Sequence, residues 1–418
     1  MKNFSKFTAF VVLFAAAAAY SAGFSILEQS TIGMGRSLAG MSAETNEPSS
    51  LYFNPSSTAW FTRPSVHVGV HILTGDTEIR NKYGSTLQGK QSGDFQGMAY
   101  IPNIAFVYPF EERFTFGLST SATSGARTKY PWNWQGRTLS VDAGVSVTEI
   151  APTLSYKVLD NLSIAGGMLI QHGEMEMDKI VAVAPAPAYE NRLHMEGDSW
   201  SYGYTLGLTW KALEKTTVGI SYRSQMDYDI PMKVRCRGHQ AALLMNYVLA
   251  DTADIHLELP QSVTFGVVQS INDKWRVMAD IAWTDWSVME ELEVKFRNGH
   301  TETTKMNWHD SWRFALGTDY KLTDKMTVSF GVAVDEHAAP DATSRQTILP
   351  DCTRYWISAG IAYQFTENLR ADFSWMHLTF KNSRIRQTDT SGAYAGQYID
   401  GEITGYSDLA SFGIRYDF

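Results

Sequence analysis

Five arginines in the second half of the chain have the chemistry to bind a carboxylate. They are Arg223, Arg276, Arg313, Arg354 and Arg370. A guanidinium group offers a fork of N–H donors that fits a carboxylate bidentately. Acids at comparable positions, such as Asp280, Asp319 and Asp372, could instead neutralise these arginines. We take Arg354 and Arg223 as candidates for holding a ligand carboxylate, and the pairing alternative stays open for both.

The run His309, Asp310 and Ser311 contains the residue types of a hydrolase triad. Neighbouring side chains of a strand point to opposite faces, so Asp310 would face away from the other two. His309 and Ser311 would then lie about 7 Å apart, which is too far for a nucleophile and its base. We therefore predict no catalytic residues.

The elements that must position such residues are strands, and the clearest strand covers residues 198–211. Its apolar positions are Trp200, Tyr202, Tyr204, Leu206, Leu208 and Trp210. Because strand side chains alternate between faces, all of these lie on one face, opposite small and polar residues. Aromatic rings at both ends of that face suit a strand that meets lipid, since such rings settle at the two membrane–water interfaces.

The same alternation recurs in about fourteen segments. Their predicted cores are residues 66–72, 104–108, 114–118, 150–156, 162–170, 198–211, 218–222, 263–267, 275–283, 312–320, 326–334, 355–365, 369–375 and 412–418. Bacterial single-chain barrels need an even number of strands. We therefore predict an all-β fold, a transmembrane antiparallel β-barrel of about 14 strands.

Connection lengths support this prediction. The connections after even-numbered strands are tight turns, such as residues 111–113 and 159–161. Those after odd-numbered strands are long, such as residues 173–198, 229–260 and 381–407. Outer-membrane barrels have short periplasmic turns and long outer loops.

One long loop contains an apolar stretch with helical spacing, residues 241–250. Leu243, Leu244, Met245 and Tyr247 could form a capture surface for an apolar ligand, and methionine adapts to irregular shapes. The alternative is a loop helix packed on its neighbours.

Cys236 and Cys352 are the two cysteines of the chain, and both fall in predicted outer loops. Their spacing matches no metal site, so we predict no metal and no cofactor. An oxidising compartment permits a disulfide between the two loops, although the sequence does not fix the distance between them.

Residues 1–21 have the features of a secretory signal peptide. Lys2 and Lys6 precede an apolar run at residues 7–19, and small residues at Ala19 and Ser21 suit cleavage. The run is too short to span a bilayer comfortably. The net charge of -9 gives no basic surface for nucleic acid. We expect an exported protein of a Gram-negative cell with no nucleic-acid partner.

Residues 22–64, which we call the hatch, lack sustained alternation and are rich in small and turn-forming residues. We predict that they form a compact plug ahead of a barrel at residues 65–418. Gly33, Gly35, Arg36, Asn54 and Pro55 are its most distinctive positions.

Several of these motifs resemble the FadL/TodX family of outer-membrane transporters. Residues 22–24 (Ala-Gly-Phe), residues 33–36 (Gly-Met-Gly-Arg) and Asn54-Pro55 are similar to the hatch of that family. Residues 349–356 (Leu-Pro-Asp-Cys-Thr-Arg-Tyr-Trp) resemble its Pro-Asp-x-x-Arg-aromatic signature. The resemblance covers essentially the whole mature chain, with one departure at Ser56, where members usually have alanine.

The resemblance implies outer-membrane transport of long-chain fatty acids or other hydrophobic compounds by passive diffusion. Ligand would be caught between outer loops, enter a pocket inside the plugged barrel and leave sideways into the membrane. The expected partners are the hydrophobic ligand, outer-membrane lipid and the barrel assembly machinery, and the expected state is a monomer. A general diffusion porin remains the alternative, and an outer-membrane lipid hydrolase is a weaker one.

The sideways exit is predicted at Thr123, Ser124 and Gly125, where small residues replace large apolar ones in the third strand. Glycine within a strand often marks a bulge or the close approach of another backbone. Asn54 can donate and accept, so it could satisfy the groups that such a kink leaves unpaired. The alternative is that Asn54-Pro55 merely forms the turn into the first strand.

Overall fold

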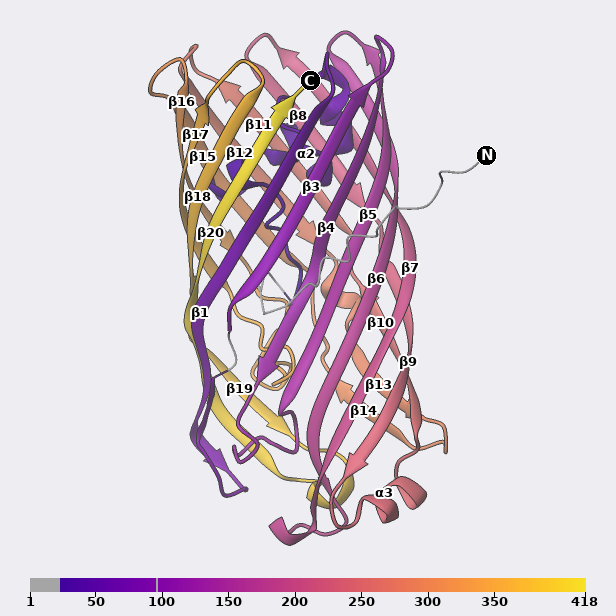
Figure 1. Cartoon of the computed structure of the whole chain (residues 1–418). Coiled ribbons are helices and arrows are strands. Elements are labelled where there is room, and N and C mark those ends of the chain that lie inside the picture. Colours follow the sequence, from indigo (N-terminus) through magenta and orange to yellow (C-terminus); the bar gives the residue numbers. More distant parts are fainter. Residues whose placement is uncertain (1–22, 95–96) are drawn as a thin grey trace, which may run out of the picture.

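The chain forms a closed antiparallel barrel in a computed structural model that describes residues 23–94 and 97–418 (Figure 1). The wall contains fourteen strands, which confirms the predicted fold. In order around the wall they are β1 (Ser65–Ser85), β3 (Ala99–Pro109), β4 (Phe114–Lys129), β5 (Asp142–Leu159), β6 (Leu162–Ala182), β7 (Glu190–Leu213), β8 (Thr216–Arg223), β11 (Ser262–Ser270), β12 (Trp275–Thr284), β15 (Ser311–Lys321), β16 (Met326–Asp335), β17 (Arg354–Gln364), β18 (Leu369–Phe380) and β20 (Tyr398–Asp417). Pairing of β1 with β20, from Ser65↔Asp417 onward, closes the cylinder.

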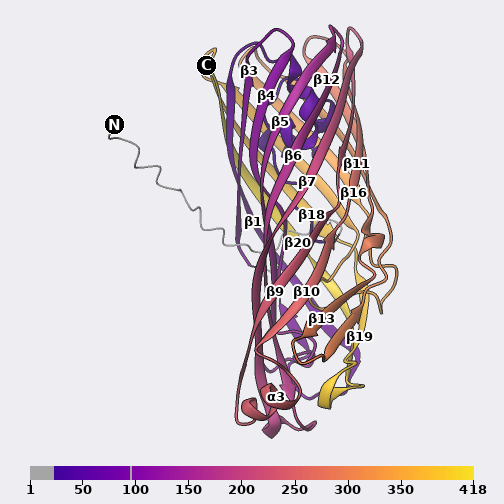
Figure 2. The same cartoon turned by 90° about the vertical axis from the view of Figure 1, so that its right-hand side faces the viewer.

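Six further strands extend the wall at one end only. They are β2 (Ser92–Asp94), β9 (Met226–Arg237), β10 (Thr252–Leu259), β13 (Glu291–Phe296), β14 (Thr301–Lys305) and β19 (Ser383–Thr388). This end, which also bears helix α3 (Ala241–Tyr247), carries the long connections, and we call it the loop end (Figures 1 and 2). The opposite turn end carries the tight turns and the C-terminus (Figure 1).

The outer face of the wall is apolar, as the alternation predicts. On β7, the side chains of Trp200, Leu206 and Trp210 are 55%, 50% and 46% exposed, which only a lipid surrounding makes favourable over so many strands. Trp312 and Tyr320 mark the two ends of the corresponding band on β15. None of the described helices is long and apolar enough to cross a membrane.

The hatch fills the barrel near the turn end. Its short helical segments are α1 (Thr31–Met34), η1 (Met41–Ala43), α2 (Ser50–Phe53) and η2 (Pro55–Trp60), seen in indigo inside the wall in Figure 1. Met34, Leu38 and Met41 are fully buried there. The predicted signal peptide, residues 1–21, lies outside the described residues.

The hatch touches the wall where the wall has glycines. A Cβ on Gly331 would lie 2.1 Å from the backbone carbon of Arg36, and one on Gly219 would lie 1.9 Å from the backbone oxygen of Ser42. Those backbones therefore fit against the inner wall because these two positions have no side chain.

Candidate functional site

Buried ion pairs fasten the hatch to the wall. Arg36 is fully buried and contacts Asp319 at 2.6 Å and Glu44 at 2.9 Å. Arg276 of β12 contacts the same two acids, at 2.6 Å and 3.2 Å. Burial raises the pKa of Glu44, but the two guanidinium groups outweigh it, so that pKa lies well below its ordinary value.

A second ion-pair group links the hatch to the last strands. Arg370 of β18 contacts Asp372 at 2.8 Å and also pairs with Glu47 of the hatch. The pairing alternative is therefore confirmed for Arg276 and Arg370. The two groups together anchor the hatch by charges at two places on the wall, β12–β15 and β18.

Asn54 lies at a different place from the one predicted. Its amide nitrogen donates to the Leu208 carbonyl and the Thr209 hydroxyl of β7, each at 3.1 Å, and its side-chain oxygen accepts from Ser56. The prediction that Asn54 satisfies the kink of the third strand is wrong, because Asn54 caps η2 against β7 instead. Gly33 and Gly35 belong to the buried helix α1 and its C-cap.

The kink itself is present in β4. The register of β4 against β5 shifts between Ala122 and Ser124, which places a bulge at Thr123. The start of the hatch pairs with β4 at this bulge. The Ile26 amide donates to the Thr123 carbonyl, and the Gly125 amide donates to the Phe24 carbonyl, both at 2.9 Å.

This pairing occupies a gap between neighbouring wall strands. β3 and β4 pair from Pro109↔Thr115 to Ile104↔Thr120, where their described pairing ends. β3 continues to Ala99 beside β1, and β4 continues to Lys129 beside β5. Residues 24–26 therefore stand where β3 would otherwise pair with β4.

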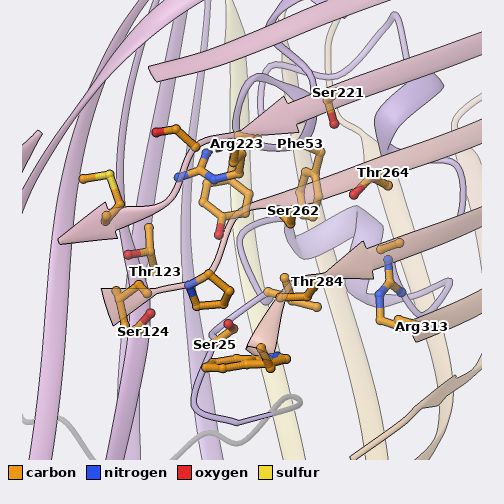
Figure 3. A pocket seen from close by; sticks show the side chains of 18 of the residues that line it. Ser25, Phe53, Thr123, Ser124, Ser221, Arg223, Ser262, Thr264, Thr284 and Arg313 are labelled. Carbon is orange, nitrogen blue, oxygen red and sulfur yellow. Dashed lines mark hydrogen bonds between the residues drawn. The ribbon is translucent and has the colours of Figure 1, made fainter. Parts of the chain in front are cut away.

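A cavity with a mixed polar and apolar lining lies on the inner side of this gap (Figure 3). Figure 3 shows Thr123 and Ser124 on one side of it, Arg313 on the other and Ser25 between them. Its volume of about 110 Å³ leaves room for several water molecules. Phe24 packs on Trp286, with ring centroids 5.3 Å apart, and Trp286 also lines the cavity.

A small apolar cavity of about 20 Å³ lies next to Phe24. Its lining is almost wholly hydrophobic and comprises Phe24, Ala126, Ala143, Gly144, Val145, Met175, Leu257, Met289, Leu292, Ile348 and Leu349. Ala126 of β4 and Val145 of β5 are paired across the two strands, on the loop-end side of the bulge. Phe24 thus belongs both to the apolar cavity and to the segment that fills the gap.

Arg354 is buried between two acids. Its Nη2 lies 3.5 Å from Asp335 and 3.9 Å from Asp351. None of its three nitrogens has a hydrogen-bond partner among the described residues. Asp351 also accepts from the Gly23 amide at 3.2 Å. Burial raises the pKa of Glu28 in the hatch to about 7, partly offset by its own backbone amide and by Arg354.

Arg223, the second candidate for a ligand carboxylate, lines the cavity beside the gap and already has an acidic partner. Its guanidinium donates to Glu149, and it lies over the ring of Tyr52 at 4.5 Å. The charge of Arg223 is therefore already neutralised inside the barrel.

The loop-end predictions have mixed outcomes. Leu243 of α3 is 48% exposed, whereas Leu244 is buried and Met245 packs on the core. The side chain of Tyr247 lies outside the described residues. A role for α3 in capture stays a prediction.

The predicted disulfide is absent, because Cys236 and Cys352 are both free thiols. Cys352 is buried in the connection between β16 and β17, and burial raises its pKa to about 11.

The hydrolase residues do not converge. Asp310 accepts a hydrogen bond from the Trp283 indole at 2.9 Å, and the exposed His309 ring interacts with the Asp310 backbone carbonyl. Ser311 is buried and lines the mixed cavity beside the gap.

Two contributors to the site were missed by sequence reasoning. Residues 24–26 are too short a strand to show alternation. Ile348 and Leu349 belong to a connection that the sequence predicts as an outer loop, yet both line the apolar cavity inside the barrel. The apolar pair Ile348-Leu349 was the one signal for that inward fold.

Comparison with known proteins gives a consistent picture. A family model described as outer membrane protein transport protein (OMPP1/FadL/TodX) matches residues 12–418. A long-chain fatty acid transport protein of Escherichia coli O6:H1 is 25% identical over 96% of this chain and 95% of its own length. A 47 kDa outer membrane protein of Pasteurella multocida is 28% identical over 95% of this chain and 98% of its own length.

Solved structures show the same architecture. A FadL homologue of Pseudomonas aeruginosa has a TM-score of 0.87 at 25% identity, over 95% of this chain and all of that one. The toluene transporter TodX of Pseudomonas putida shares the fold. Its TM-score is 0.71 at 16% identity, over 96% of this chain and 99% of that one.

Proposed function

Because the chain belongs to the OMPP1/FadL/TodX family of outer-membrane transport proteins, we propose that it carries hydrophobic ligand by passive diffusion and releases it sideways between β3 and β4. The family transports fatty acids or other hydrophobic compounds across the outer membrane of Gram-negative bacteria. The turn end then faces the periplasm and the loop end faces the medium.

The anchored hatch supports an exit through the wall. Ligand that moved straight along the barrel axis would have to displace residues such as Arg36 and Glu44, which are held by buried ion pairs. Breaking a buried pair by removing one partner costs about 3–5 kcal/mol, far more than displacing a short apolar contact. The segment at residues 24–26 offers less resistance, because two backbone hydrogen bonds hold it to β4.

The pairing of residues 24–26 with β4 is the observation that carries the proposal. An unpaired strand edge inside a membrane is costly, because lipid offers no hydrogen-bond partners. Residues 24–26 satisfy the β4 edge while the gap is closed. Withdrawal of this segment opens a passage from the apolar cavity to lipid, bordered by Thr123, Ser124 and Gly125.

Transport then needs no energy source. Each buried CH₂ group favours an apolar surrounding by about 0.8 kcal/mol, so a long alkyl chain partitions strongly from water into lipid. Leu243 at the tip of α3 is proposed to help capture ligand at the loop end. Arg354, whose nitrogens lack hydrogen-bond partners, is proposed to meet a ligand carboxylate.

Ligand specificity within this proposal favours a long-chain fatty acid. Outer-membrane lipid receives the ligand, the barrel assembly machinery inserts the chain, and a monomer is sufficient for the route.

A transport assay tests this function against the porin alternative. Cells that lack their own fatty-acid transporter should take up radiolabelled long-chain fatty acid only when they express this chain. Purified protein in planar bilayers should give no large, stable current without ligand, because the hatch fills the lumen. Sustained large currents would favour a general diffusion porin if fatty-acid uptake is also the same in cells with and without this chain.

A further inference from the structure

We propose that Gln29 is the positioning residue that holds the gap between β3 and β4 closed. Gln29 lies three residues after Ile26, the last residue of the segment that occupies the gap, and is 2% exposed. Its backbone carbonyl accepts a hydrogen bond from the Asn103 side chain of β3. Its side-chain nitrogen donates to the Ala122 carbonyl of β4. This one residue therefore connects β3 and β4, the strands on either side of the gap. The inference rests on the proposed sideways release.

The position of Gln29 matches the point where the two strands separate. The last described β3–β4 pair is Ile104↔Thr120. Toward the loop end, Asn103 is the next residue on β3 and Ala122 is the second residue on β4. A continuous sheet would place a backbone hydrogen bond here. Gln29 supplies side-chain and backbone hydrogen bonds in its place. In the closed state it therefore bonds to both strands at the point where their pairing ends.

Gln29 also fixes the segment that must move. Its side-chain nitrogen lies 3.3 Å from the Ile26 carbonyl, as a second acceptor. The Ile26 amide donates to Thr123 in turn. Gln29 thus tethers residues 24–26 at their downstream end, next to the bulge. Without that tether, the two backbone hydrogen bonds of the segment would have to keep the gap closed alone.

The bonding of Gln29 is incomplete, which suits a contact that must break. The side-chain oxygen of Gln29 is buried and has no hydrogen-bond partner among the described residues. A fully satisfied network would make this edge rigid. Here the closed state leaves the Gln29 acceptor without a partner, so opening gives up fewer hydrogen bonds than it would with a fully bonded Gln29 amide.

The test compares Gln29→Leu with a matched control, Gln346→Leu. Gln346 is also a buried amide that donates to two backbone carbonyls, those of Lys305 and Thr343, but it lies away from the gap. Hydrogen exchange measured by mass spectrometry reports gap opening through the Gly125 amide, which donates to Phe24. Loss of the two Gln29 side-chain bonds should speed that exchange roughly ten- to thirtyfold.

Uptake provides the second readout. Gln29→Leu should raise ligand-independent entry of a small uncharged dye into proteoliposomes, whereas Gln346→Leu should behave as the unaltered protein does. Gln29→Asn keeps the amide but shortens its reach, so it should show the same direction of change. If Gln29→Leu fails to run as a folded, heat-modifiable barrel, the Gln29→Asn variant provides the test instead. Unchanged exchange and entry in folded Gln29 variants would overturn the assignment.

A crosslink separates this inference from the proposed function. Ser25 and Ser124 form a non-hydrogen-bonded antiparallel pair, whose Cα atoms lie about 4.5 Å apart and suit a disulfide. In a cysteine-free background, oxidised Ser25→Cys/Ser124→Cys should block uptake. If the crosslink blocks uptake while Gln29 variants behave normally, only the role of Gln29 is wrong. If crosslinked protein transports normally, the sideways route itself is wrong.

Discussion

Replacing Arg36 by methionine should release the hatch from the wall without unfolding the barrel. Methionine keeps an apolar stem of similar length but removes the guanidinium that contacts Asp319 at 2.6 Å and Glu44 at 2.9 Å. The intact group contains two arginines and two acids, so its formal charge is zero. The variant would leave two buried carboxylates facing Arg276 alone.

The size of the effect follows from that imbalance. Removing one partner of a buried ion pair costs about 3–5 kcal/mol, and the remaining Arg276 places this site at the lower end. At about 3 kcal/mol, the population of undocked hatch rises roughly a hundredfold, since each 1.4 kcal/mol is a factor of ten. The barrel strands keep their own hydrogen bonds, so their stability should change little.

Acid should reveal the same loss. In the unaltered protein the pKa of Glu44 is depressed, so its contribution to docking is present above its ordinary pKa and is lost only as the pH falls through the lower value. Arg36→Met removes part of that depression. Docking in the variant should therefore weaken at a higher pH, on approach to the ordinary glutamate range near 4.5.

Hydrogen exchange of peptides from residues 31–47 measures docking directly, after correction for intrinsic rates at pH 7 and pH 5. The matched control is Arg63→Met, because Arg63 is 44% exposed and contacts Asp417 at 3.2 Å. Exposed pairs contribute at most about 1 kcal/mol, so this control should exchange within roughly fivefold of the unaltered protein. Equal exchange in Arg36→Met and Arg63→Met would refute the view that buried ion pairs anchor the hatch.

Three further substitutions probe the plug, the ligand headgroup and capture. Gly331→Ala should also loosen the hatch, because its Cβ would lie 2.1 Å from the Arg36 backbone, whereas Gly166→Ala, with 3.7 Å to Leu206, should not; differential exchange of hatch peptides checks both. Arg354→Ala should weaken fatty-acid binding at least tenfold but spare an uncharged hydrocarbon of similar length, as calorimetry can show, and equal losses would mean that Arg354 only supports the fold. Leu243→Ser should slow uptake at low ligand concentration without altering the maximal rate, and an unchanged dose response would remove α3 from the capture step.

The barrel was predictable because its physics is local and repeated. Each strand, such as residues 198–211, carries a period-2 pattern dictated by lipid on one face, and connection lengths set the topology. The extra loop-end strands were not predicted, because their outer faces meet water and lose the apolar alternation. Asp229 and His256 on β9 and β10 are an example.

The site was much less predictable. The bulge near Gly125 could be read from local composition, but its partner in the hatch could not. Asn54 had the right chemistry and the wrong location, because any amide can satisfy backbone groups and nothing in the sequence fixes which strand lies beside it. Burial decided the arginines in the same way. Arg223 has Glu149 beside it through a contact that spans seventy-four positions of sequence.

The crosslink between Ser25→Cys and Ser124→Cys tests the central claim most directly, because it fixes the hatch segment to β4 and alters nothing else in the wall. The measurement is uptake of radiolabelled long-chain fatty acid by proteoliposomes that contain the cysteine-free double variant, before and after reduction. The sideways route predicts that oxidised protein is inactive and that a reductant restores transport. Equal uptake in the oxidised and reduced states, with crosslinking verified by mass spectrometry, would contradict it.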